Sequence, residues 1–177
     1  MTPTLSIESA TEAYRSLASG ISETERESAK AWYRMARCHA HAVCIALGVS
    51  LECGASVISA FSPRVTWNRN CVLAHAFANG EAVACLGNSI RAAERAKTLG
   101  FGALNGLKTN AFARNIAGDT NPVTIDAWML RPFGMRSVNK RNYRILSEAI
   151  RTVAAENGMN PADMQALLWI RIRGKDA

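Results

Sequence analysis

The sequence contains no C-x-x-C pair, little proline and no long apolar run, and each absence narrows the class of protein. No window is apolar over the roughly 20 residues that a membrane-spanning helix needs. Residues 1–20 lack the basic start and apolar block of a signal peptide. Abundant alanine and short β-branched runs favour helices over strands. We therefore expect a soluble, cytoplasmic, all-α protein.

The cysteines and histidines give little support for a metal site. Cys38 lies beside His39 and His41, but no second ligand cluster has a matching spacing, so we expect no metal. Cys71 and His75 lie one helical turn apart, and we expect both to be buried. The cysteines stand mostly among apolar residues and are expected to be buried free thiols of a reducing compartment. They are Cys38, Cys44, Cys53, Cys71 and Cys85.

The length of 177 residues predicts a single domain, residues 1–177. Start and stop signals predict about nine helices in it. Ser22 and Glu25 have the spacing of a capping box. Ser62 and Pro63 have the pattern of an N-cap followed by the first helical position. The nearly apolar stretch 51–61 predicts a central, buried helix. The predicted helices cover residues 6–18, 22–46, 51–61, 63–79, 88–98, 107–116, 126–131, 145–155 and 163–173.

The net charge is +7, and it is unevenly distributed along the chain. Residues 1–30 carry three basic and five acidic side chains, a net charge of −2, which leaves +9 for the remainder. A basic body indicates a polyanionic partner, most simply nucleic acid, although a solubilising surface has the same composition. The predicted phosphate contacts are Arg64, Arg69, Arg91, Arg95, Arg131, Arg136, Lys140 and Arg141.

The stretch "LNGLKTNAFARNIAGDTNPVTIDAWMLR", residues 104–131, places a lysine and an aspartate next to predicted helix starts. Gly106 forms a turn between two helices, and Lys108 and Thr109 begin the second one. Backbone N–H groups at such a helix start can bind phosphate. The positive end of the helix dipole favours the neutral amine of Lys108, which suits attack on a sugar carbon.

Asp126 follows Lys108 by eighteen residues. It lies between the extended, apolar "PVTI" and the predicted helix "AWMLR", so it has the position of an N-cap. A carboxylate fixed there could stabilise a developing positive charge on a sugar or deprotonate Lys108.

These residues resemble the helix-hairpin-helix DNA glycosylase superfamily, the group that contains endonuclease III and the adenine glycosylase. In that family a hairpin of the form L-P-G-V-G-x-K-T-A precedes V-D-T-H, and the catalytic Lys and Asp have the same eighteen-residue separation. Here "KTNAF" is similar to the hairpin's end, and "VTIDAWMLR" to the V-x-V-D-T-H-V-x-R block. Upstream, "SVISAFSPRVTWNRN", residues 56–70, resembles the family's L-L-S-A-Q-x-T helix end and the helix that follows it.

The resemblance implies a glycosylase-like core at residues 50–135, flanked by helices in 1–48 and 140–173. Lys108 would then form a Schiff base with the sugar, Asp126 would activate it, Phe61 would fill the gap left by a flipped base, and Trp128 would line the pocket. The family's four-cysteine loop is absent, so no iron–sulfur cluster is expected, and the hairpin offers a place for a monovalent cation. The implied DNA contacts are Phe61, Arg64, Arg69, Gly106, Thr109, Arg131, Arg136, Lys140 and Arg141.

The function expected from this resemblance is a DNA N-glycosylase, with or without abasic-site lyase activity, acting on a damaged or modified base. The sequence leaves the oligomeric state open, with a monomer favoured over an oligomer. One alternative is an inactive descendant, which binds nucleic acid or inhibits a host enzyme. Another is an enzyme acting on modified thymine in phage DNA. The C-terminal "PADMQALLWIRIRG" also resembles small phage- and plasmid-borne proteins that share this core. The plain alternatives are a surface lysine at position 108 and a simple N-cap at Asp126.

Overall fold

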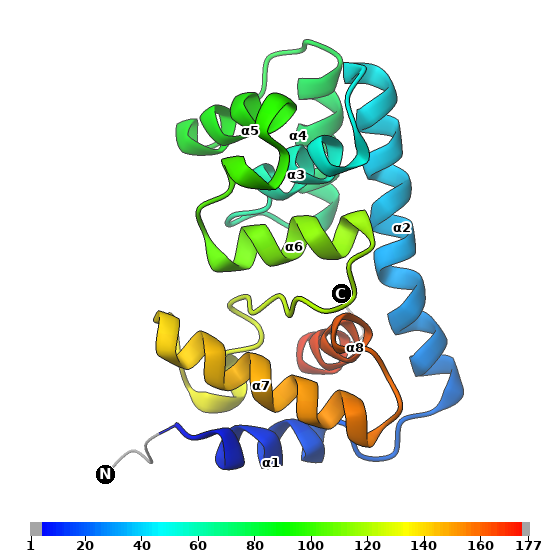
Figure 1. Ribbon diagram of the computed structural model, residues 1–177, viewed down its shortest axis with the longest axis vertical. Coiled ribbons are helices and arrows are strands. Elements are labelled where there is room, and N and C mark those ends of the chain that lie inside the picture. Colours follow the sequence, from blue (N-terminus) through cyan, green and yellow to red (C-terminus); the bar gives the residue numbers. More distant parts are fainter. Residues whose placement is uncertain (1–4, 175–177) are drawn as a thin grey trace. The chain divides into compact units, whose positions relative to one another are not determined.

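The computed structural model describes residues 5–174, and within them the chain is all-α, with eight α-helices, two short 3-10 helices and no strand (Figure 1). This confirms the all-α part of the predicted fold class. The helices are α1 (Ile7–Leu17), α2 (Glu23–Leu47), α3 (Leu51–Phe61), α4 (Trp67–Ala78), α5 (Gly87–Leu99), η1 (Gly100–Ala103), α6 (Leu107–Ala117), η2 (Arg131–Phe133), α7 (Lys140–Glu156) and α8 (Pro161–Arg173).

The chain forms two compact units. The first unit comprises residues 1–33 and 120–177, and the second unit comprises residues 34–119. Helix α2 contributes its first half to one unit and its second half to the other. The core predicted at residues 50–135 therefore has segments in both units, and its equivalence to a glycosylase core stays a prediction.

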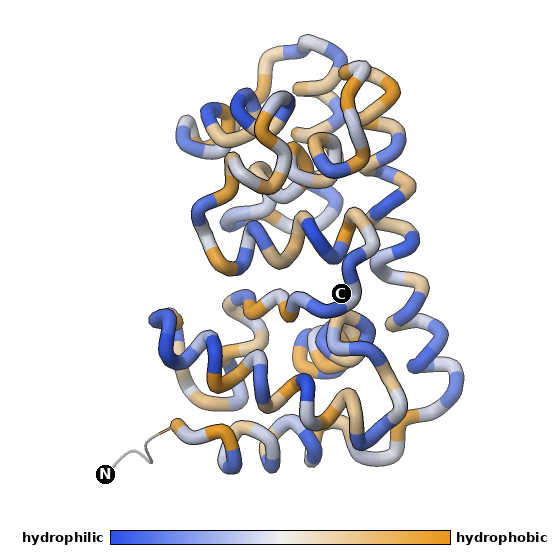
Figure 2. Tube along the Cα trace, viewed as in Figure 1, coloured by the Kyte–Doolittle hydropathy of each residue, from blue (hydrophilic) through white to orange (hydrophobic). Residues whose placement is uncertain are grey.

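In the first unit, α7 packs against both α1 and α8 (Figure 1). The sequence of α7 repeats apolar residues at helical spacing, and Figure 2 shows hydrophobic and hydrophilic residues alternating along it. Its side chains Leu146, Ile150 and Val153 are fully buried. They lie on one helical face and form a core with Ala10 and Tyr14 of α1. The N-caps Ser6, Asn139 and Asn160 each accept a hydrogen bond from a backbone N–H of the first turn, which fixes where α1, α7 and α8 begin.

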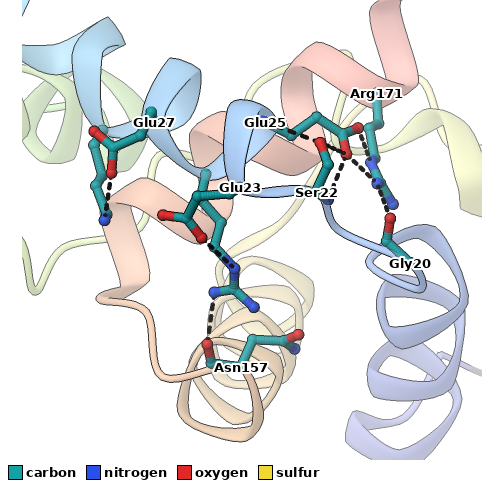
Figure 3. Close-up of polar contacts among 9 residues, drawn as sticks. Gly20, Ser22, Glu23, Glu25, Glu27, Asn157 and Arg171 are labelled. Atoms are coloured by element: carbon teal, nitrogen blue, oxygen red, sulfur yellow. Dashed lines mark hydrogen bonds and ion pairs between the residues drawn. The ribbon is translucent and has the colours of Figure 1, made fainter.

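Arg171 of α8 holds the connection between α1 and α2 (Figure 3). Its guanidinium donates to both carboxylate oxygens of Glu25, each at 2.8 Å, and to the carbonyls of Leu17 at 2.7 Å and Gly20 at 3.2 Å. Glu25 also accepts from the backbone N–H of Ser22 at 2.9 Å, and Ser22 Oγ accepts from the Glu25 N–H at 3.3 Å. The predicted capping box at Ser22 and Glu25 is therefore confirmed, and Arg171 ties it to the C-terminal helix.

In the second unit, α3 is the central helix and packs against α4, α5 and α6. All residues from Gly54 to Phe61 are buried, which confirms the prediction of a central, buried helix. Alanine and glycine allow close approach to α2. A Cβ atom added at Gly54 would lie 2.8 Å from the carbonyl oxygen of Ala40 on α2, nearer than real contacts of this kind. Gly54 is thus required by the helix packing.

The predicted start of α4 is wrong. Ser62 does not begin a helix at Pro63 but ends α3, with its Oγ donating to the Ser59 carbonyl at 2.8 Å. The chain then turns through Arg64, whose φ of +62° is unusual for a non-glycine residue. Thr66 is the N-cap, with its side chain accepting from the Arg69 N–H, and α4 begins at Trp67. Ser62 thus has the local pattern of an N-cap but serves as the C-cap of α3, and the turn that follows delays the start of α4 to Trp67.

Within residues 5–174, no single helix has the length and apolar character to cross a membrane. Helices α2 and α3 satisfy that length and composition test only as a pair, and the pair is bent by 109°.

Candidate functional site

Lys108 lies in the first turn of α6, in the second unit, and it is half-buried. Its Nζ donates to Ser62 Oγ at 2.6 Å and lies 4.8 Å from the centre of the Phe112 ring. Ser62 ends α3, so the lysine joins the end of one helix to the start of another. The sequence resemblance included both segments, and the structure brings Lys108 and Ser62 together. Lys108 is held in a defined position, unlike a mobile surface lysine.

The turn before Lys108 is held by side-chain donors. Asn110 Nδ2 donates to the carbonyls of Phe101 at 3.1 Å and Leu104 at 3.4 Å, and Arg95 donates to the carbonyl of Ala103 at 3.3 Å. A monovalent cation at this turn would be ligated by carbonyl oxygens of this kind, and it would compete with the Asn110 amide for two of them.

Gly106 is the N-cap of α6, with φ −82°, and supplies no side-chain cap to its first turn. Thr109 Oγ1 donates to the Gly106 carbonyl at 3.1 Å, and the Thr109 carbonyl accepts from Ser59 Oγ at 2.7 Å. A Cβ atom at position 106 would lie 2.9 Å from Thr109 Oγ1, so glycine fits this turn closely. Gly106 and Thr109 therefore shape the start of α6, and their predicted contact with DNA stays a prediction.

Asp126 belongs to the first unit, and no α-helix begins next to it. The predicted helix at 126–131 is wrong, because the chain forms a turn that leads into the short η2. The prediction of a capping role is correct in a narrower sense: Asp126 Oδ1 accepts from the backbone N–H groups of Trp128 at 2.9 Å and Met129 at 3.2 Å. Its Oδ2 accepts from Trp169 Nε1 at 2.9 Å. Three N–H groups thus hold this carboxylate.

The negative charge of Asp126 acts on its surroundings. Burial, and secondarily this charge, raises the pKa of Tyr143 to about 12. Burial and the same charge raise the pKa of Tyr14 still further. Both phenols are hydrogen-bond donors, Tyr14 to the Met129 carbonyl at 2.9 Å and Tyr143 to the Val123 carbonyl at 2.7 Å. The segment that carries Asp126 is therefore fixed from both sides by neutral tyrosines.

Trp128 lies beneath an arginine. The Arg131 guanidinium carbon lies 3.6 Å from the centre of the Trp128 ring, and that of Arg173 lies 5.6 Å from the same ring and 4.9 Å from the Trp169 ring. Trp169 also packs edge-on against Trp32 at 5.8 Å. The predicted role of Trp128 in lining a pocket stays a prediction, whereas its stacking with Arg131 is observed.

The first unit contains a basic segment, residues 131–144, with five cationic side chains. These are Arg131, Arg136, Lys140, Arg141 and Arg144. No acidic residue occurs between Asp126 and Glu148. All five side chains are exposed, and none forms an ion pair within the described part of the chain. By contrast, Arg15, Lys30 and Arg171 of the same unit are each paired with a glutamate.

The predicted contacts from the second unit are mixed. Arg64, Arg69 and Arg91 are all exposed, and Arg69 also donates to the Ala84 carbonyl at 3.3 Å. Phe61 is only 1% exposed and packs edge-on against Phe77 at 5.3 Å, so its predicted insertion into the DNA stack is wrong. The reason is that Phe61 closes the apolar face of α3, where the helix is buried on every side.

The histidines form a pair that the sequence did not predict. His39 Nδ1 and His75 Nε2 are 3.0 Å apart, joining α2 to α4, and burial together with His39 lowers the pKa of His75. Cys44 and Cys71 are buried as expected. Cys53 and Cys85 are only partly buried and Cys38 is exposed, so the prediction of buried thiols is wrong for Cys38 and only partly correct for the other two. His75, which was also expected to be buried, is only partly buried. Within residues 5–174 no three ligand side chains converge as a metal site would require.

The chain belongs to a family of unknown function (DUF7178), whose match covers residues 6–176. No curated protein and no solved structure is significantly similar to the chain. The candidate functional residues are therefore those of two separate sites. Lys108 belongs to the second unit, and Asp126 and the basic segment belong to the first.

Proposed function

We propose that this protein binds DNA through the basic segment, residues 131–144. The supporting observation is that its five exposed cations have no acidic partner in the described structure. Lys140 and Arg141 even occupy the first turn of α7, where the positive end of the helix dipole disfavours cations. Phosphate groups would neutralise them there and also accept from the N–H groups of the helix start.

The salt dependence of binding tests this proposal. Five phosphate contacts on duplex DNA give a slope of log K against log salt of about −4.5, and loss of one contact reduces it by about 0.9. We expect Lys140→Gln to show that reduction in a fluorescence-anisotropy titration with labelled duplex. Lys30→Gln is the matched control, because Lys30 is already paired with Glu27 at 2.8 Å. Absence of binding at about 50 mM salt, or equal effects of the two substitutions, would overturn the proposal.

Base excision at Lys108 is the second candidate function. The observation that favours it is that Lys108 is half-buried and fixed by Ser62 Oγ and the Phe112 ring, so its amine has a defined position for attack. In this reaction the amine of Lys108 forms a bond to the sugar C1′, and the glycosidic bond breaks as the base leaves with a proton. Ring opening then gives a Schiff base, which eliminates the 3′ phosphate or is hydrolysed.

The observed contacts of Asp126 are structural. Its carboxylate already accepts from three N–H groups of the first unit. In the proposed base excision Lys108 is therefore the reacting group, and Asp126 anchors the turn of the first unit.

Borohydride trapping separates the two functions. An excising enzyme with lyase activity gives a covalent adduct with duplex containing an abasic site, and Lys108→Ala abolishes the adduct. Lys97→Ala is the control, because Lys97 is a lysine of the same unit paired with Glu94. A glycosylase without lyase activity releases a base with no adduct. DNA binding with neither product eliminates base excision and retains the binding function, and failure to bind DNA would favour a protein-interaction role.

A further inference from the structure

The guanidinium of Arg131 lies over the indole of Trp128. The guanidinium carbon is 3.6 Å from the centre of the Trp128 ring, the separation expected for stacking. Arg131 is exposed, and no acidic side chain of the described residues pairs with it. The result is a planar cation held on an aromatic ring, with its charge unneutralised.

Hydrogen bonding to Asp126 fixes the position of Trp128. Its backbone N–H donates to Asp126 Oδ1 at 2.9 Å, and the other carboxylate oxygen accepts from the indole of Trp169. The Arg173 guanidinium lies 5.6 Å from the Trp128 ring centre and adds a second cation without an acidic partner among the described residues. These contacts fix the position of Trp128 in the fold and place two guanidiniums near its ring, so a ligand that uses the ring meets a position already set by the fold.

Guanidinium planes and aromatic rings are the surfaces on which proteins stack unpaired bases. Each base in a duplex is already stacked on both faces, so such a surface is useful only where a base is unpaired. Lys140 and Arg141 stand in the same basic segment and can contact the phosphates of the same strand. Single-stranded DNA offers both partners for these residues: unpaired bases, which would stack on Arg131 or Trp128, and phosphates, which would contact the nearby cations.

We propose that Trp128 and Arg131 form a stacking platform for an unpaired base, and that the protein prefers single-stranded DNA to duplex. The base stacks on the guanidinium of Arg131 or, when that side chain moves to a phosphate, on the indole of Trp128. This inference rests on the proposed DNA binding by the basic segment. It adds the strand preference and the residues that set it.

Arg131→Lys tests the platform, because it keeps the charge and removes the plane. We would measure Kd for an oligo(dT) of about 15 nucleotides and for a duplex of equal length at one salt concentration. The wild type is expected to bind the single strand more tightly than the duplex. Arg131→Lys should weaken single-strand binding about tenfold and change duplex binding less than about twofold. Arg136→Lys, an exposed arginine of the same segment that stacks on no described ring, should change neither.

A second variant provides a separate readout. Trp128→Phe keeps an aromatic face and should retain most of the strand preference, whereas Trp128→Leu should lose it. Oligo(dT) should quench tryptophan fluorescence in the wild type and quench it less in Trp128→Phe. The variants are compared at equal helicity by circular dichroism.

The outcomes distinguish the two proposals. Binding of neither oligonucleotide would overturn the DNA-binding function itself. Binding of both with equal affinity, or an Arg131→Lys variant with an unchanged preference, would overturn the platform and leave the DNA-binding function standing.

Discussion

Substitution of Asp126 by asparagine separates a structural role from a catalytic one. The carboxylate accepts from the backbone N–H groups of Trp128 and Met129 through Oδ1 and from the indole of Trp169 through Oδ2. An asparagine can keep an oxygen facing the backbone, but its NH2 group then faces the indole N–H, and two donors meet. The variant loses one charge-assisted hydrogen bond and leaves a partly buried indole donor without an acceptor.

The size of the effect follows from those contacts. Hydrogen bonds to charged groups contribute about 1.5–3 kcal/mol, and the remaining two bonds weaken when the acceptor becomes neutral. We expect Asp126→Asn to lower the free energy of unfolding by about 2–3 kcal/mol. The measurement is urea denaturation followed by tryptophan fluorescence, which reports on Trp128 and Trp169 directly. Glu148→Gln removes one exposed carboxylate of the same unit and should change stability by less than about 0.5 kcal/mol.

A wild-type urea midpoint for Asp126→Asn would refute the anchoring role. If that variant were also unable to release a base from DNA, Asp126 would be a catalytic group, as the sequence resemblance implies. If stability falls as expected and any base release persists in proportion to folded protein, the carboxylate is structural.

Three further substitutions test the fold. The hydrogen bonds from Arg171, and secondarily those from Ser22, lower the pKa of Glu25 to about 2. This carboxylate therefore stabilises the fold above about pH 4.5, and its contribution is lost as the pH falls toward 2. The difference in Tm between the wild type and Glu25→Gln should shrink over the same pH interval. Phe61→Ala should cost about 3–5 kcal/mol in urea denaturation, because the side chain is 1% exposed, and an intact midpoint would contradict its place in the core. Gly54→Ala should cost about 1–3 kcal/mol, because its Cβ would lie 2.8 Å from a carbonyl of α2, and Ala55→Gly on the same helix serves for comparison.

The sequence predicted helices well where a cap and an apolar period coincide. The capping box at Ser22 and Glu25 and the buried helix at residues 51–61 both lie where expected. A capping box is a local signal, since a side chain and an N–H three residues away decide it. Such signals depend little on contacts with distant parts of the chain.

The predictions were wrong where the same local sequence suits two different roles, or where a residue's role depends on packing against distant parts of the chain. Ser62 has the local sequence of a helix N-cap, but in the structure it ends α3, and Thr66, which was not predicted as a cap, caps α4. Phe61 has the same local sequence whether it points into the core or toward a ligand, and contacts with Phe77 decide its burial. The His39–His75 pair joins residues 36 positions apart, which no helical period can reveal.

The eighteen-residue spacing of Lys108 and Asp126 also needs a local explanation before it can support catalysis. Lys108 contacts Ser62 and Phe112 in one unit, and Asp126 anchors a turn in the other, so each residue has a structural reason for its position. The cations of the basic segment differ in this respect. They are exposed, have no acidic partner within residues 5–174, and two of them oppose the dipole of α7. Because no contact of the described fold requires this charge arrangement, we propose an anionic ligand for it, and Arg131, over Trp128, lies at one end of that segment.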